Sequence, residues 1–551
     1  MSTFSHATTI PLIFVLLITT TSSTPTSSSS LHFSKSSRII LVEQTRKRAL
    51  FEDSIMSTLA QAQSVLSSAT ALAMASTTQH DDGPSDPSDI KTAVVGPTHD
   101  CLDLLEDTLE QLSNVAYQGH HDPTDVQTWL SAALTNQVTC KESLLLTKQS
   151  HHNKATILLE TLAHNMTRTL GNSLALYVNH VMNDKYYNYP SSSRPVGGGG
   201  RKLLLTEDDN KFPAWLPAAK RKLLEASVGE LEPHAVVAKD GSGTHTSIAE
   251  AVRDVTAAAA VGTMAGGGGG GSGVIYVKAG TYKENLNFKT KQKNVVLVGD
   301  GKGKTVIVGS RNADDGSTTY DSATVAAMGD GFMARDLTIV NSAGPSKHQA
   351  VALRVGSDRA VIFRCSIQGY QDTLYTLSKR QFYRETDIYG TVDLIFGNSA
   401  VVFQNCNIYT RSGSRGDNFI TAQGRTDPNQ NTGISIHNCR IESDGSGAKT
   451  YLGRPWKEYS RTVVMQSVIG GHVASAGWAP WSGGFALKTL YYAEYMNSGP
   501  GAGISGRVSW PGYKGAVGPL EAGKFTVGQL IGGNSWLPST GVSFDAGLIG
   551  V

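Results

Sequence analysis

Two aspartates with similar surroundings, Asp372 and Asp393, are the strongest candidates for chemistry in this sequence. They are 21 positions apart, and each stands among apolar and aromatic residues. If the fold places them side by side, repulsion and apolar surroundings raise the pKa of one carboxyl group and leave the other ionised. One aspartate then serves as an acid and the other as a nucleophile or base. The alternative is that each aspartate only caps a turn or joins a structural ladder.

A four-residue phrase that ends in Ile recurs along the second half of the chain. Successive Ile residues are 28, 21, 20, 33 and 28 positions apart: Ile339, Ile367, Ile388, Ile408, Ile441 and Ile469. Repeats of roughly 20 to 50 residues indicate a solenoid, and short β-branched runs with scarcely a helical pattern indicate a parallel β-helix. The step from Ile367 to Ile388 equals the step between the two aspartates, so we expect these to lie one coil apart, about 4.8 Å. A β-sandwich, the alternative, does not predict the repeated phrase.

Two glutamines and an arginine have the chemistry to assist the aspartates. Gln349 precedes Asp372 by 23 positions, about one coil, and Gln371 precedes it directly. Their amide N–H groups are suited to stabilise an oxyanion, although amides also form structural ladders in solenoids. Arg454 lies in a Gly-Arg-Pro-Trp turn that fixes its direction, and a fixed guanidinium keeps a neighbouring carboxylate charged and oriented. Three aromatic residues offer flat faces for sugar rings, or fill a core: Tyr375, Phe396 and Trp456.

The composition of the chain excludes little. Its 551 residues carry a net charge of +2 without a Lys/Arg-dense stripe, which argues against nucleic-acid binding. The apolar run from Ile10 to Ile18 is too short for a bilayer, which needs about 20 residues, and is typical of a signal peptide. We therefore expect a signal peptide at residues 1–24 and a secreted protein that does not enter the membrane.

The remaining chain divides by composition into four further parts. Residues 25–49 form a Ser-rich linker, and residues 50–190 carry helical periodicity, as in Leu102, Leu105, Leu109 and Leu112, with an acidic interruption at 80–89. We predict a bundle of helices there. Residues 191–234 form a second linker, with Arg-Lys-Leu-Leu at 201–204 and again at 221–224, either protease targets or solvated charges. Residues 235–551 form the β-helix.

Residues 235–551 resemble plant pectin methylesterases. The resemblance rests on five separate motifs: Gly280–Glu284, the Gln349 segment, Tyr370–Tyr375, the Asp393 segment and Leu452–Trp456. It implies a right-handed parallel β-helix and hydrolysis of galacturonate methyl esters. In that family's mechanism Asp393 is the nucleophile, Asp372 the proton donor, and Gln371 with Gln349 the transition-state stabilisers. It also implies that Arg454 orients Asp393 and that substrate contacts come from Thr281, Gln349, Arg454 and Trp456.

Residues 50–190 resemble the pectin methylesterase inhibitor domain, on the segment Val126–Leu134. The resemblance implies an all-α pro-region, removed by a processing protease at a basic Arg-Lys-Leu-Leu site. It also implies cystine bridges in the pro-region, of which only the pair Cys101–Cys140 remains available. The sequon at Asn165 is a glycosylation site if the chain is secreted.

The chain departs from the family pattern in the β-helix as well. Thr386 stands where the family has the cysteine that pairs with the counterpart of Cys406, and Leu394 replaces the usual Phe. Neither departure removes a reacting group.

Other functions remain open from the residues alone. Two carboxylates about 5 Å apart also suit a retaining glycosidase, and β-helices also host pectin-cleaving enzymes such as lyases. The alternative without catalysis is a wall-binding or inhibitor protein whose β-helix is degenerate. The sequence lacks a G-x-S-x-G elbow, an H-E-x-x-H pair and a C-x-x-C pair, so we expect no serine mechanism, metal or cofactor. The expected partners are methyl-esterified pectin, a proteinaceous inhibitor and the processing protease, in the plant cell wall.

Overall fold

The structure, a computed structural model, describes residues 35–77, 96–117, 122–145, 154–182, 232–260, 273–413, 416–445 and 447–550. The chain divides into two compact units, residues 1–46 and 47–551, and each is described by itself. The described part of the first unit, residues 35–46, is the beginning of helix α1 (Lys35–Thr77). The predicted signal peptide, the acidic stretch at 80–89 and both Arg-Lys-Leu-Leu sites lie outside the described residues.

Helix α1 begins inside the segment that we assigned to a Ser-rich linker at 25–49. From Lys35 onward that segment is helical instead, because Arg, Lys, Leu and Glu, which favour helices, outnumber its serines. The other helices of the N-terminal half are α3 (Pro97–Tyr117), α4 (Pro123–Leu145), α5 (Lys154–Leu176) and the π-helical turn η1 (Tyr177–Val181).

The helices of the N-terminal half share an apolar core. Leu104, Leu112, Leu130 and Leu170, from three helices, are fully buried in one cluster. A disulfide bond joins Cys101 on α3 to Cys140 on α4. Proline is the first residue of both α3 and α4, the position where its missing N–H costs nothing. No helix in the described part of the chain is long and apolar enough to cross a membrane.

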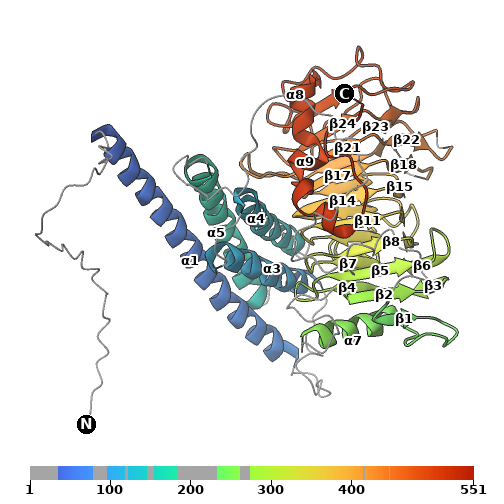
Figure 1. Ribbon diagram of the computed structural model, residues 1–551, viewed down its shortest axis with the longest axis horizontal. Coiled ribbons are helices and arrows are strands. Elements are labelled where there is room, and N and C mark those ends of the chain that lie inside the picture. Colours follow the sequence, from blue (N-terminus) through green and yellow to red (C-terminus); the bar gives the residue numbers. More distant parts are fainter. Residues whose placement is uncertain are drawn as a thin grey trace, which may run out of the picture. The chain divides into compact units, whose positions relative to one another are not determined.

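The second half of the chain is a parallel β-helix, as predicted, and its coils stack in Figure 1. Sheet A contains β1 (Ala235–Val237), β2 (Gly273–Val277), β5 (Val295–Gly299), β8 (Met333–Arg335), β11 (Ala360–Phe363), β14 (Arg380–Arg384), β17 (Ala400–Gln404), β21 (Gly433–His437), β24 (Arg461–Met465), β26 (Tyr491–Tyr495) and β27 (Tyr513–Ala516). Sheet B contains β3 (Gly280–Lys283), β6 (Thr305–Gly309), β9 (Thr338–Asn341), β12 (Ser366–Gln368), β15 (Asp387–Gly390), β18 (Asn407–Thr410), β22 (Arg440–Ser443) and β25 (Val468–Ile469). Sheet C contains β4 (Leu286–Phe288), β7 (Val325–Ala327), β10 (Leu353–Val355), β13 (Leu374–Thr376), β16 (Ile395–Gly397) and β20 (Thr421–Gln423). A two-stranded sheet pairs β19 (Asn418–Phe419) with β23 (Thr450–Tyr451).

The predicted isoleucine ladder is confirmed along sheet B. Ile339, Ile367, Ile388, Ile408, Ile441 and Ile469 pair in register from coil to coil, and all are fully buried. Each repeat of the phrase begins with a left-handed residue, such as Arg364 (φ 50°), Glu385 (φ 52°) or Asn405 (φ 55°). This conformation turns the chain sharply from sheet A into sheet B. The repeated phrase is therefore the sequence of a corner followed by a core strand.

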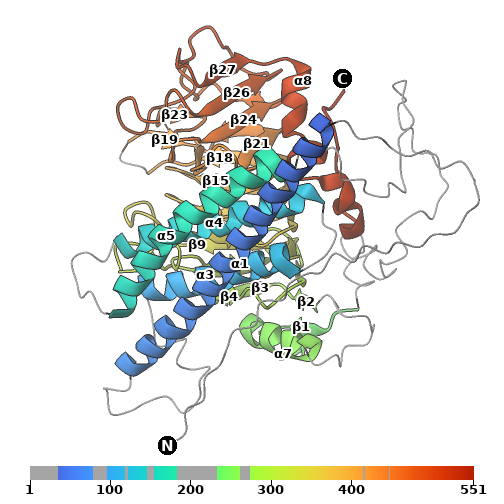
Figure 2. The same ribbon diagram turned by 90° about the vertical axis from the view of Figure 1, so that its left-hand side faces the viewer.

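Short helices close the β-helix and cover part of its outer surface. Helix α7 (Ile248–Ala260) packs beside β1 and β2 at the N-terminal end of the solenoid, where Figure 2 shows it. The carboxylate of Glu284 accepts hydrogen bonds from the Ile248 and Ala249 N–H groups, which caps this helix. The C-terminal turns lie against sheet A through Val527, Trp536 and their neighbours: α8 (Pro519–Ala522), η3 (Gly523–Phe525), α9 (Val527–Leu530), η4 (Gly533–Ser535) and η5 (Leu537–Thr540).

Thr386 occupies one position of a ladder that otherwise carries cysteines. Cys365, Thr386 and Cys406 follow each other in register, and Cys406 is followed by Cys439. All three of these cysteines are buried free thiols. The Thr386 hydroxyl donates to main-chain oxygens of Ile362 and Arg384 at 3.2 and 3.1 Å.

We expect Thr386→Cys to form a disulfide with Cys406 and to stabilise the β-helix. Neighbouring strands are about 4.8 Å apart, within the Cα separation that a disulfide spans, and closing such a loop stabilises by about 2–4 kcal/mol. The number of thiols titrated in denaturant should fall from three in the unaltered chain to two in the variant. The melting temperature should be higher in the variant, but only when no reductant is present. Four titratable thiols in the variant would contradict the prediction.

Candidate active site

The two aspartates occupy equivalent turns on neighbouring coils. Strand β13 pairs with β16 so that Leu374 faces Ile395, which places Asp372 level with Asp393. Both have left-handed backbone conformations, with φ of 61° and 49°. Asp tolerates this strained region better than most residues. The N–H of Asp372 donates to the Val392 oxygen at 2.9 Å, which locks the two turns together.

A cavity of about 300 Å³ lies over this pair of turns. Eight predicted site residues line it: Gln349, Gln371, Asp372, Tyr375, Asp393, Phe396, Arg454 and Trp456. Thr281 is not among the lining residues; it lies at an exposed position of β3 in sheet B, whereas the aspartates precede strands of sheet C. The structure thus gathers every predicted site residue except Thr281.

Arg454 holds the Asp393 carboxylate with two parallel hydrogen bonds. Its Nε and one terminal nitrogen each donate to a different oxygen at 2.7 Å. The guanidinium lies between two aromatic rings, 4.1 Å from the centroid of Phe419 and 4.4 Å from that of Trp481. A bidentate pair clamped in this way fixes both the charge and the direction of the carboxylate.

The turn that carries Arg454 depends on a close approach of backbones. A Cβ on Gly453 would come within 2.1 Å of the Thr421 hydroxyl, so only glycine fits. The N–H of Arg454 donates to the Thr421 oxygen at 2.9 Å. Sequence reasoning found this turn but missed Phe419 of β19 and the loop residue Trp481, which approach Arg454 only in the fold.

The two carboxyl groups differ in their electrostatic surroundings. Asp372 and Asp393 are both buried, with exposed fractions of 7% and 6%. Burial raises the pKa of Asp372 well above its usual value, and the charge of Asp393 raises it further. Burial also raises the pKa of Asp393, but there the hydrogen bonds and charge of Arg454 oppose the shift. Of the two, Asp393 is therefore the carboxyl group that ionises more readily, and Asp372 is the one that keeps its proton more readily, an arrangement suited to an acid beside a nucleophile.

The floor of the cavity is aromatic. Tyr375 and Phe396 stack with ring centroids 4.2 Å apart, and the edge of Trp456 meets Phe396 at 5.8 Å. Tyr375 and Phe396 are each only 3% exposed, so they belong to the core as much as to the site. The half-buried Trp456 is better placed to contact a ligand.

Helix α4 supplies one wall of the cavity through Thr139, Glu142 and Ser143. Sequence reasoning did not place any residue of the helical region at the site. The ion pair between Glu142 and Lys457 ties this wall to the turn that follows Trp456. In the whole chain, helix α4 therefore forms one side of the cavity in which the aspartates lie.

Comparisons with known proteins assign both halves of the chain. A family model described as "Pectinesterase" matches residues 234–534, and one described as "Plant invertase/pectin methylesterase inhibitor" matches residues 20–176. "Probable pectinesterase/pectinesterase inhibitor 35" of Arabidopsis thaliana is 60% identical over 461 residues, which cover 83% of this chain and 82% of the relative. "Pectinesterase 2" of Citrus sinensis is 48% identical over 456 residues, 82% of this chain and 81% of the relative.

A solved structure also resembles the chain. Pectin methylesterase from carrot is 52% identical, with a TM-score of 0.55, over 59% of this chain and 99% of the carrot chain. The chain belongs to the pectinesterase family. This membership selects an esterase among the functions that the residues alone left open, over a glycosidase, a lyase or a non-catalytic wall protein.

Proposed function

We propose that this chain hydrolyses the methyl esters of pectin through a covalent acyl-enzyme on Asp393. The observation that carries the proposal is the clamped, ionised carboxylate of Asp393 beside the buried carboxyl group of Asp372. A carboxylate oriented in this way can attack a carbonyl carbon, and its neighbour holds the proton that the leaving group needs.

In the first step, a carboxylate oxygen of Asp393 attacks the ester carbonyl carbon of a galacturonate unit. Negative charge then develops on the carbonyl oxygen, and the amide N–H groups of Gln349 and Gln371 stabilise it from the cavity wall. As the tetrahedral intermediate collapses, the bond to the methoxy oxygen breaks. Asp372 transfers its proton to that oxygen, so methanol leaves and an anhydride joins Asp393 to the sugar.

In the second step, Asp372 acts as a base. It is now ionised and takes a proton from water while the water oxygen attacks the acyl carbon. The bond to Asp393 breaks, which restores the starting charges of both aspartates and releases a galacturonic acid group. This acid then loses its proton to solvent and becomes a carboxylate. Arg454 keeps Asp393 oriented through both steps. Trp456 contributes a face against which a sugar ring can stack, and Tyr375 and Phe396 support it from below.

The proposed setting is the plant cell wall, after removal of the signal peptide at 1–24 and of the helical region. Processing by a protease within 191–234 would remove the α4 wall from the cavity and open it to a polymer. The proposed glycosylation site, Asn165, lies in α5, so glycosylation would mark the pro-region and not the mature enzyme. Thr281, proposed to contact substrate, would act only on a polymer that extends beyond the cavity.

Methanol release tests the proposed activity. The β-helix, cleaved within 191–234 and separated from the helical region, is incubated with highly methylated pectin, and methanol and polymer length are followed together. We expect methanol to appear at constant polymer length. Shortening of the polymer in step with the reaction would indicate glycosidase or lyase chemistry. Absence of methanol from a protein with a cooperative melting transition would overturn the proposal.

A further inference from the structure

Arginines form a row along the beginning of the strands of sheet A. Strand β11 pairs with β14 so that Arg359 is level with Arg380 on the next coil. Arg380 in turn faces Ala400, and Ala400 faces Gly433. The pairing of β21 with β24 places Arg461 level with Gly433. Equivalent positions on five successive coils thus read Arg, Arg, Ala, Gly, Arg, with a spacing of about 4.8 Å from coil to coil.

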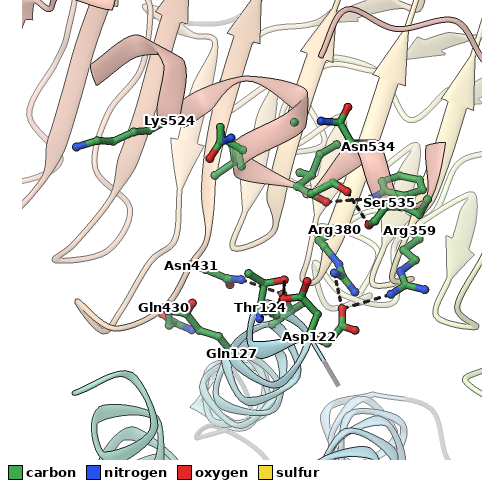
Figure 3. Close-up of a pocket in the computed structure, with 18 of the residues that line it drawn as sticks. Asp122, Thr124, Gln127, Arg359, Arg380, Gln430, Asn431, Lys524, Asn534 and Ser535 are labelled. Carbon is green, nitrogen blue, oxygen red and sulfur yellow. Dashed lines mark hydrogen bonds and ion pairs between the residues drawn. The ribbon is translucent and has the colours of Figure 1, made fainter. Parts of the chain in front are cut away.

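The three arginines of this row line a groove of about 1030 Å³, part of which Figure 3 shows. The two small residues in the row leave room, and Arg461 extends across one of them: a Cβ on Gly433 would lie 2.9 Å from its Nε. The C-terminal turns form the opposite wall, with Asn534, Ser535 and Lys524 (Figure 3). None of its lining residues belongs to the catalytic cavity.

The charge of the groove is one-sided. Five cationic side chains line it: Arg359, Arg380, Arg425, Arg461 and Lys524. Its two acidic lining residues, Asp122 and Asp125, come from the beginning of α4 in the helical region. Three other carboxylates lie near these cations without lining the groove. Asp358 pairs with Arg380 at 2.5 Å, Glu521 pairs with Lys524 at 2.6 Å, and Asp427 lies near Arg425. After loss of the helical region, the lining residues of the β-helix carry positive charge alone.

Two of these arginines are held together without a carboxylate partner. In the described part of the chain, neither Arg425 nor Arg461 forms an ion pair; their Nε groups donate to the main-chain oxygens of Gln430 (2.9 Å) and Thr432 (2.6 Å). Burial lowers the pKa of Arg425 to about 10, and burial with the like charge of Arg425 lowers that of Arg461 to about 9. Two partly desolvated guanidinium groups next to each other are costly unless an anion joins them.

A carboxylate already occupies the other end of the row. Asp125 of α4 is 2.6 Å from a terminal nitrogen of Arg380 and 3.3 Å from one of Arg359. Both arginines reach toward the end of the helix in Figure 3. The whole chain therefore shows which chemical group these arginines bind, and it is the group that a de-esterified uronate carries.

We propose that this arginine groove is a second saccharide site, which binds a de-esterified, polyanionic stretch of galacturonan. The proposal rests on the function proposed above, whose product is this polymer. Product carries a carboxylate on every sugar along a stiff chain, whereas fully esterified substrate is neutral. A row of guanidinium groups can pair with the carboxylates that repeat along the product, and it has no such partner on the neutral substrate. The groove therefore binds product in preference to substrate. An enzyme anchored to the stretch that it has de-esterified would stay close to the remaining esters.

Binding of an unesterified decagalacturonate to the whole chain, measured by calorimetry at low salt, tests the proposal. We expect the double variant R425Q/R461Q to bind at least about tenfold more weakly, because it loses the charged hydrogen bonds to the carboxylates of the ligand. The control R253Q/R440Q removes the same charge from exposed arginines elsewhere and should bind like the unaltered chain. Fully methylated decamer should not distinguish the variants.

Two further variants keep the test decisive if R425Q/R461Q does not fold. The pair R359Q/K524Q changes exposed side chains and should weaken binding several-fold. Asp125→Asn removes the carboxylate that competes in the groove and should strengthen binding, whereas Asp103→Asn, which breaks a different contact with Lys289, should not.

Equal affinity of all these variants, or equal weakening by the control pair, would overturn the proposal. The readout needs no turnover, so it is independent of the esterase mechanism. Loss of methanol release with arginine-dependent binding intact would refute the proposed function and leave an anion site. Methanol release with binding that ignores the arginines would refute the groove alone.

Discussion

Replacing Asp393 with Asn is expected to reduce methanol release from pectin by at least about 10⁴-fold, the scale of loss when a nucleophile is removed from an enzyme. An amide oxygen is a poor nucleophile, so no acyl-enzyme forms, while the side chain keeps almost the same shape. The measurement is initial methanol release from methylated pectin by the β-helix separated from the helical region, at enzyme concentrations high enough to detect this residual rate.

The structure also predicts what Asp393→Asn does to stability. Arg454 is held between Phe419 and Trp481, so its charge stays in place and loses its partner. Breaking one side of a buried pair costs about 3–5 kcal/mol, and less here because the Arg454 side chain is 21% exposed. We expect a lower melting temperature but a folded protein. A second consequence distinguishes chemistry from structure: without the charge of Asp393, the pKa of Asp372 falls.

A matched control distinguishes the loss of the nucleophile from the effect of replacing any carboxylate on this coil. Asp387 lies six positions earlier on the same coil, at the start of β15, and pairs with Lys302 at 2.8 Å. Asp387→Asn makes the identical chemical change outside the cavity, so its rate should stay within about twofold, as for surface substitutions. If Asp393→Asn kept more than a hundredth of the activity, the acyl-enzyme on Asp393 would be wrong.

The sequence predicts the β-helix and the catalytic pair because both depend on the same repeat. Ile367 and Ile388 are one coil apart in the sequence, and the two aspartates are separated by the same number of residues. The repeat that predicts the register of the isoleucines therefore also predicts that the aspartates are neighbours. Arg454 was found by a different signal, a Gly-Arg-Pro-Trp turn that is unusual whatever its surroundings. These features are local in sequence or strictly periodic, and a single chain displays them without knowledge of its neighbours.

The features that escaped prediction depend on contacts across the fold. Phe419 lies on the short strand β19 and Trp481 on a loop, and neither belongs to the repeated phrase that marks the coils in the sequence. The arginine row was hidden because Ala400 and Gly433 interrupt it and coil lengths differ between its members. The pattern of α4 predicts a helix, but the surface that the helix contacts depends on residues far away in the sequence, such as Asn398, which donates to the Thr135 hydroxyl of α4.

Cleavage between the helical region and the β-helix, followed by separation of the pieces, is expected to raise activity on polymeric pectin at least about 100-fold. Helix α4 lines the catalytic cavity through Thr139 and Ser143, and a polymer cannot enter while it stays there. One apolar cluster contains Leu130 and Leu134 of this helix together with Tyr375 and Phe396 of the site. If substrate enters only when the helical region is undocked, every 1.4 kcal/mol by which the helical region binds the β-helix lowers the activity tenfold.

Cleavage alone should not be sufficient, because buried polar contacts also hold the helical region. Nζ of Lys379 lies 2.7 Å from Asp107 of α3 and 3.0 Å from Asp330, and both Lys379 and Asp107 are fully buried. Asn398 and Gln430 of the β-helix donate to the Thr135 hydroxyl and the Ser131 oxygen of α4 at 2.8 and 3.1 Å. We therefore expect the cut chain to remain inhibited until the pieces are parted, which gel filtration and methanol release measure together.

The pH at which the pieces part follows from Asp100 of α3. Its carboxylate accepts a hydrogen bond from the Thr318 hydroxyl at 2.6 Å, and burial raises its pKa from 3.8 to about 7. Docking therefore takes up a proton, so it is strongest below pH 4, weakens as pH rises from about 4 to about 7, and changes little above. Over that window the docking constant should fall by roughly 10²–10³-fold.

Asp100→Asn should remove most of this pH dependence and keep the cut chain inhibited at pH 7, whereas Asp103→Asn should leave the pH dependence unchanged. Inhibition that strengthens with rising pH, or an uncut chain as active as the separated β-helix, would show that α4 does not close the site.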